Sequence, residues 1–162
     1  MSEESSIGVL IDEIDAHRQA LLKIFQFYSG FRTDKLDFTN PSVADAIVIS
    51  DCFVNYYTCL ETVFFRISQF FENSLDKEKW HSDLLGKMTL RIEGIRERAV
   101  SDKSYPLLIE FKNFRHFKRY YFSYDYDWDK LNFLMKKFAE LDKTIGADLD
   151  NFRRFLSDLK NA

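Results

Sequence analysis

Apolar residues recur every three or four positions along most of the chain, which is the spacing of one face of an α-helix. Between residues 7 and 28 this spacing predicts a first helix, and Gly30 is expected to end it as a C-terminal glycine. Asn40 and Pro41 have the pattern of a cap followed by a first helical residue. They predict a second, long helix that runs without a breaker to Asn73.

Three further helices follow from the same periodicity. The third is expected to start near Asp76 and to carry apolar residues as far as Ile95. Pro106 is expected to open the fourth, and the fifth begins near Trp128, with Gly146 as a position where it could kink. Long helices joined by short connections predict an all-α fold, an antiparallel helical bundle of about five helices.

Composition supports this fold class. The chain has 162 residues, which suits one domain over residues 1–162, and residues 1–6 are polar and expected to be disordered. Only five Gly and two Pro are present, too few for the many turns of an all-β protein. We find no charged leader before an apolar run and no apolar run near the length of a membrane span, so we expect a cytoplasmic protein with no membrane contact.

The cysteines and histidines are placed unfavourably for a disulfide or a metal. Cys52 and Cys59 are two helical turns apart, about 10 Å of rise, which is too far for a bond between them. They are expected to be small core thiols in a reducing cytosol. His17, His81 and His116 are dispersed along the chain. We therefore expect no metal site and no cofactor.

Charge is distributed most unevenly in residues 111–131. The first nine of these carry no acid and four cations, namely Lys112, Arg115, Lys118 and Arg119. The second half alternates acids and rings: Tyr124, Asp125, Tyr126, Asp127, Trp128 and Asp129. The net charge of −3 does not predict nucleic-acid binding, but this local strip suits a phosphate, and stacked rings suit a base.

Residues 115–131 also resemble a family motif, that of the HepT-like ribonuclease toxins of the HEPN superfamily. That motif is an Arg, four to six residues, then a His, often followed by one residue and a Tyr; the subfamily resembled here runs roughly R-H-F-F-R-H-A-Y-x-Y-E-L-D-W-E-K-L. This chain matches its Arg-His-Phe opening at Arg115 and its Asp-Trp-acid-Lys-Leu ending at Asp127. Tyr120 stands where the family has its catalytic His, and Phe122 where it has its modifiable Tyr.

Two upstream segments extend the resemblance to about residues 50–135. Residues 57–67, YTCLETVFFRI, resemble the family's Y-x-x-I-E-x-x-F-x-R-I helix. Trp80 and His81, with Leu84, Leu85 and Met88, resemble its W-H-x-x-L-L-x-x-M segment. The resemblance implies a helical bundle that pairs as a two-fold homodimer, with two signature motifs facing one shared cleft. It also implies a nucleotidyltransferase antitoxin of the MNT type as a partner.

Metal-independent RNA cleavage needs a base for the ribose 2′-hydroxyl, a cation for the phosphate and an acid for the leaving oxygen. The resemblance gives these duties to the Arg and His of the motif. Arg115 can hold a phosphate through its planar fork, whereas Tyr120, with an ordinary pKa of about 10, is a poor general base. His116 is the only imidazole nearby, but it lies one residue from Arg115, about 100° around the helix, so either a catalytic or a supporting role is open.

The surrounding residues complete the predicted site. Lys112, Lys118, Arg119 and Tyr124 are candidates for RNA or phosphate contacts. Glu61 could orient Arg115 through a buried salt bridge or pair with Arg66 on the surface. Asp127, with its neighbouring acids, is expected to cap a helix and to pair with Arg119 or Lys130, because the glycine and terminal Glu of an EF-hand loop are absent.

Two functions therefore remain open. The first is a HepT-like, metal-independent ribonuclease of a toxin–antitoxin system, or a weakened descendant of one, acting on single-stranded RNA. The second is a catalytically inactive HEPN dimer that binds RNA, a nucleotide or a nucleotidyltransferase partner.

Overall fold

Five helices account for most of the chain. The computed structural model describes residues 2–72 and 77–162, and of residues 77–82 it describes the backbone. The helices are α1 (Glu3–Asp34), α2 (Val43–Glu72), α3 (Lys77–Met88), α4 (Ser104–Tyr120) and α5 (Trp128–Asn161). No β-strand occurs among the described residues, so the prediction of an all-α helical bundle is confirmed.

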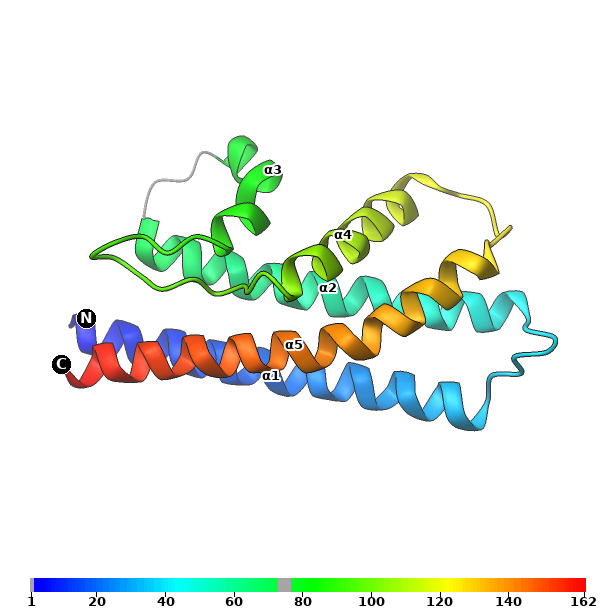
Figure 1. Cartoon of the computed structure of the whole chain (residues 1–162), viewed down its shortest axis with the longest axis horizontal. Coiled ribbons are helices and arrows are strands. Elements are labelled where there is room, and N and C mark those ends of the chain that lie inside the picture. Colours follow the sequence, from blue (N-terminus) through cyan, green and yellow to red (C-terminus); the bar gives the residue numbers. More distant parts are fainter. Residues whose placement is uncertain (1, 73–76) are drawn as a thin grey trace.

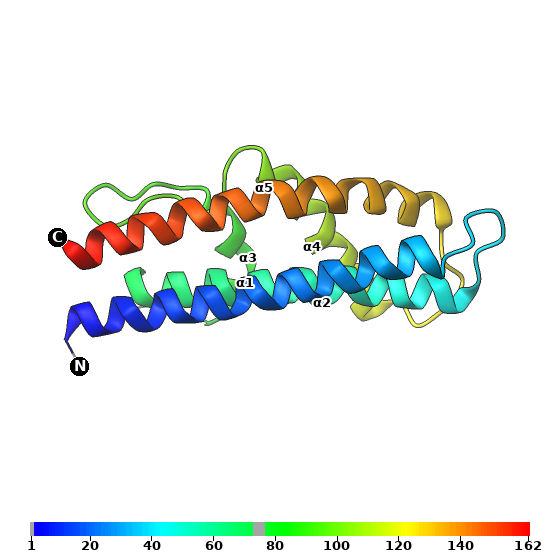
Figure 2. The same ribbon diagram turned by 90° about the horizontal axis from the view of Figure 1, so that it is seen from below.

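Helix α2 organises the bundle, because it contacts each of the other four helices. Helices α1, α2 and α5 lie side by side along the long axis, with α1 antiparallel to the other two (Figures 1 and 2). Helix α4 packs on α2 and α5, and α3 packs on α2. The chain ends lie together at one end of the bundle, away from the connection between α4 and α5 (Figure 1).

The core is aromatic at its centre, which accounts for much of the Phe content. Phe138 of α5 is fully buried, and its ring meets rings from α1, α2 and α4 at centroid distances of 4.7–5.5 Å. These partners are Phe25, Tyr28, Phe53, Tyr56 and Phe111. Tilted and edge-to-face pairs of this kind are favourable beyond the apolar area they bury.

The first two helices differ at their ends from the sequence expectation. Residues 3–6, expected to be disordered, form the first turn of α1, where the Ser2 hydroxyl accepts the Ser5 N–H at 3.2 Å. Gly30 does not end α1, which continues to Asp34. Helix α2 begins with Ser42 as cap, because Ser42 and Asp45 exchange hydrogen bonds of 2.8 and 3.1 Å in a capping box.

Helix α3 ends seven residues earlier than predicted. It stops at Met88, and Ile92 and Ile95 belong to a turn in which Gly94 adopts a φ of 73°. The backbone of Ile92 pairs with that of Arg96 to close this turn. The expected start near Asp76 and the side chains of Trp80 and His81 lie outside the described residues.

Helix α4 begins earlier than expected, and α5 is not interrupted. Helix α4 starts two residues before Pro106, and its first N–H, from Ser104, is accepted by the Ser101 hydroxyl. Helix α5 is uninterrupted through Gly146. A Cβ at this position would stand 2.6 Å from Nη2 of Arg18, so the end of the Arg18 side chain would have to shift.

One described helix, α2, is long and apolar enough by composition to cross a membrane, which the sequence analysis did not anticipate. Its position as the central helix of the bundle explains the apolar composition, because its buried residues pack against the other helices. Cys52 and Cys59, both on α2, are free thiols, and burial raises the pKa of each to about 11. Within the described residues no cluster of three or more His, Cys, Asp or Glu could hold a metal ion.

Candidate functional site

Arg115 is held against α2 by a two-pronged ion pair. Its Nη1 and Nη2 donate to the two carboxylate oxygens of Glu61 at 2.8 and 2.7 Å, and its guanidinium carbon lies 4.8 Å from the centre of the Tyr57 ring. Of the two contacts considered for Glu61, the one with Arg115 is present, whereas Arg66 pairs with Glu13. The fork geometry fixes Arg115 at a defined position on the α2–α4 surface.

Burial and charge act together on this pair. Both side chains are mostly buried, at 16% exposed for Arg115 and 19% for Glu61. Burial alone would lower the pKa of Arg115, but the hydrogen bonds and charge of Glu61 outweigh it and raise that pKa. Burial and the Glu61 charge raise the pKa of the Tyr57 hydroxyl, so it stays neutral. Arg115 is therefore a permanent cation at this surface.

A cleft of about 440 Å³ opens beside Arg115, between α2 and α4, and we call it the basic cleft. Helix α4 contributes Arg115, Lys118 and Arg119, and Tyr126 of the following segment closes one side. Helix α2 contributes the remaining lining residues, Ile47, Ser50, Asp51, Val54 and Thr58. The buried Ser50 hydroxyl has no hydrogen-bond partner within the described residues.

Apart from Arg115, which pairs with Glu61, the cations in the second half of α4 form no ion pair with the described acids that follow the helix. In the described part of the chain no ion pair involves Lys112, Lys118 or Arg119, so the expected pairing of Asp127 or its neighbours with Arg119 is absent. Lys130 pairs with Glu110 instead, at 3.1 Å. Asp127 does cap α5, accepting the N–H groups of Asp129 and Lys130, as predicted.

His116 and Tyr120 lie outside the basic cleft. Their rings contact each other with centroids 5.0 Å apart, and Tyr120 is 64% exposed. Relative to Arg115 they point about 100° and 140° around the helix axis, since each residue turns the chain by 100°. The structure therefore does not bring either ring to the cleft that Arg115 lines.

The segment 121–127 returns the chain from α4 to α5 and joins the cleft wall. Nζ of Lys118 donates to the Tyr126 hydroxyl at 2.7 Å and lies 4.7 Å from the centre of its ring. Tyr124 is 68% exposed and lines no described cavity, and Lys112 is half-buried outside the basic cleft. Of the predicted phosphate contacts, the structure thus gathers Lys118 and Arg119 around Arg115.

Sequence reasoning identified Glu61 as a partner of Arg115 but missed the α2 residues that line the cleft. Ser50, Val54 and Thr58 follow each other at intervals of four, so they lie on one helical face. Polar residues on an apolar helix face were the available signal. The periodicity could not show that α4 packs on this face.

Comparison with known protein families gives a match. Neither a curated protein nor a solved structure matches the chain. The model of a protein family described as HepT-like protein matches residues 48–156, which is more than half of the chain and includes α4, Glu61 and the whole basic cleft except Ile47. The chain therefore belongs to the HepT-like protein family.

Proposed function

We propose that this protein is a cytoplasmic, HepT-like member of a toxin–antitoxin system that holds the phosphates of single-stranded RNA in the basic cleft. The observation that carries the proposal is the convergence of Arg115, Lys118 and Arg119 on one cleft within an acidic protein. Arg115 donates two hydrogen bonds to Glu61 and a longer one, of 3.5 Å, to the Thr58 hydroxyl, which leaves other N–H groups of its five for a phosphate.

Cleavage by a single chain is expected to be weak or absent. Tyr120 occupies the position of the family's catalytic His in the resemblance, and both it and His116 lie away from the cleft. A site without its proton-transfer group loses roughly 10²–10⁴ in rate. A second copy facing α4 could bring these rings to the phosphate, which is why we include a two-fold homodimer in the proposal.

The test is binding and cleavage of single-stranded RNA by the purified protein. We expect binding that weakens with salt and with Arg115→Ala, and little cleavage, while Tyr120→His increases cleavage. Lys160→Ala is a control, because it removes a cation from the far end of the bundle (Figure 1). Absence of binding at low salt would exclude single-stranded RNA as the ligand of the basic cleft.

A second function, a binding module without catalysis, is supported by the separation of His116 and Tyr120 from the cleft. In that case Tyr120→His does not cleave RNA, and the protein forms a stable complex with an MNT-type nucleotidyltransferase encoded beside it. Strong cleavage by the natural protein that survives Tyr120→Phe and disappears with His116→Ala would instead assign proton transfer to His116.

A further inference from the structure

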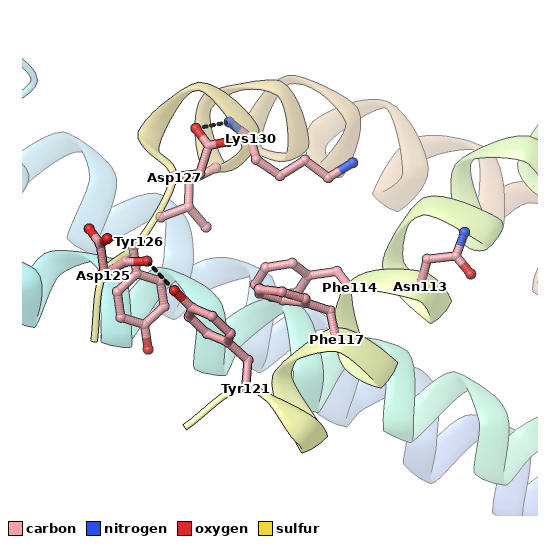
Figure 3. A pocket seen from close by; sticks show the side chains of 9 residues that line it. Asn113, Phe114, Phe117, Tyr121, Asp125, Tyr126, Asp127 and Lys130 are labelled. Atoms are coloured by element: carbon pink, nitrogen blue, oxygen red, sulfur yellow. Dashed lines mark hydrogen bonds between the residues drawn. The ribbon is translucent and has the colours of Figure 1, made fainter. Parts of the chain in front are cut away.

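A second cavity, of about 390 Å³, lies on the other side of α4, and we call it the aromatic pocket (Figure 3). Helix α4, the segment 121–127 and the first turn of α5 enclose it. It is lined by Asn113, Phe114, Phe117, Tyr121, Asp125, Tyr126, Asp127, Lys130 and Leu131. No residue proposed above for proton transfer lines it.

The walls of the aromatic pocket suit a flat ligand. The rings of Phe117 and Tyr121 stack with centroids 4.6 Å apart and an angle of 25° between their planes. The Tyr121 hydroxyl donates to the carbonyl of Asp125 at 3.0 Å, which ties this ring to the opposite side of the pocket (Figure 3). Phe114 and Leu131 are buried at its base, whereas Phe117 is 51% exposed and free to contact a ligand.

The polar groups around the aromatic pocket are mainly hydrogen-bond acceptors. The Asp125 carboxylate has no side-chain partner within the described residues, and Asp127 caps α5 through Oδ1 alone. The one cation, Lys130, is engaged by Glu110. A planar ligand with N–H donors therefore fits these groups better than one with acceptors only.

The aromatic pocket and the basic cleft share a wall. Tyr126 lines both, and Lys118 of the basic cleft is hydrogen-bonded to its hydroxyl. Tyr126 therefore borders both a site for a phosphate and a site for a ring. A nucleotide combines both groups in one molecule.

We propose that the aromatic pocket binds a base of the RNA whose phosphate occupies the basic cleft, and that it prefers bases with an exocyclic amino group over uracil. The inference rests on the proposed function. Stacking on Phe117 and Tyr121 supplies affinity that does not depend on which base is bound. The Asp125 carboxylate supplies the preference, since carboxylates accept hydrogen bonds from base amino groups.

The experiment compares short oligoribonucleotides of cytidine, adenosine and uridine with an abasic ribose–phosphate chain of equal length. For the natural protein we expect tighter binding of the cytidine and adenosine chains than of the uridine chain, and weakest binding of the abasic chain. Phe117→Ala should weaken binding of the cytidine chain roughly tenfold and leave the abasic chain unchanged. Asp125→Asn should remove the preference for cytidine over uridine.

Phe122→Ala is the matched control, because Phe122 is 88% exposed in the same segment and lines neither cavity. Thermal unfolding of each variant establishes that it is folded. Equal binding of all four chains by the natural protein would overturn the base site and leave the basic cleft intact. Equal losses in Phe117→Ala and Phe122→Ala would also overturn it, whereas absence of binding by any chain would overturn both proposals.

Discussion

Two arginines, Arg96 and Arg115, pair with glutamates of α2 that lie eleven residues apart. The first pair has a structural role, and the second holds an arginine at the basic cleft. Eleven residues are three helical turns, so Glu72 and Glu61 lie on nearly the same face of α2. Arg96 reaches this face from the turn after α3, and Arg115 reaches it from α4.

The two guanidinium groups differ in how many of their N–H groups can still bind a ligand. The Arg96 side chain has no exposed surface, and its N–H groups are taken by Glu72 and by the carbonyls of Lys87, Leu90 and Glu97. Arg115 has a carboxylate and an aromatic ring on one side and the basic cleft on the other. The number of N–H groups left unbonded, rather than the ion pair itself, separates a structural arginine from a binding one.

Arg96→Ala should cause the largest loss of stability. It removes the guanidinium that binds Glu72 and leaves several carbonyls without donors, and removing one partner of a buried pair costs roughly 3–5 kcal/mol. Urea unfolding measures the loss. Arg91→Ala is the control from the same turn, because its pair with Glu97 is exposed and should contribute less than about 1 kcal/mol. Similar losses in both variants would contradict the structural role of Arg96.

Glu61→Gln should lower stability less than Arg96→Ala does, and it should also change the affinity for single-stranded RNA. It weakens a partly buried pair, so a loss of about 1–2 kcal/mol is expected. It also removes a negative charge beside the basic cleft and frees Arg115, so single-stranded RNA should bind more tightly at low salt. Titration of labelled RNA measures this.

Glu13→Gln, the same charge change at a pair on the other side of α2, should leave RNA affinity unchanged. Weaker binding by Glu61→Gln would mean that Glu61 matters more for orienting Arg115 than for neutralising it.

Alkaline pH should lower the stability of the protein, because α2 carries two buried thiols, Cys52 and Cys59, whose ionisation burial opposes. Cys52 and Cys59 have a pKa of about 11 in the folded protein against 9.0 ordinarily. Between these values the unfolded chain has lost protons that the folded chain keeps, so stability falls as pH rises. Urea midpoints from pH 8 to pH 10 measure this decline.

The variant Cys52→Ala/Cys59→Ala should show a shallower decline over the same range. A midpoint that stays constant or rises with pH in the natural protein would show that these thiols ionise freely in the folded state.

Helix existence was predictable from apolar spacing, but helix ends were not. The end of α3 depends on contacts distant in sequence, because Arg96 draws residues 87–97 into a turn on Glu72. At Gly30 a Cβ would meet nothing within 4 Å, so no packing contact requires α1 to stop there. Apolar residues such as Ile92 and Ile95 kept a helical spacing there without being helical.

The candidate site was only partly predictable, because the spacing of residues along one helix does not show how helices pack against each other. The charge strip identified Arg115, Lys118 and Arg119 because they are close in sequence. Periodicity along one helix could not show that α4 turns His116 and Tyr120 away from its contact with α2, or that Tyr126 folds back against Lys118. These relations arise only when two elements pack together.

The rings that pack on Phe138 make the folding of α1, α2, α4 and α5 cooperative. Rings from α1, α2 and α4 all rest on this one side chain of α5, so detaching any of these helices exposes the same ring to water. Helix α3 contributes no ring to the cluster among the described contacts. Amide hydrogen exchange should therefore show one shared opening free energy for α1, α2, α4 and α5, and a lower one for α3.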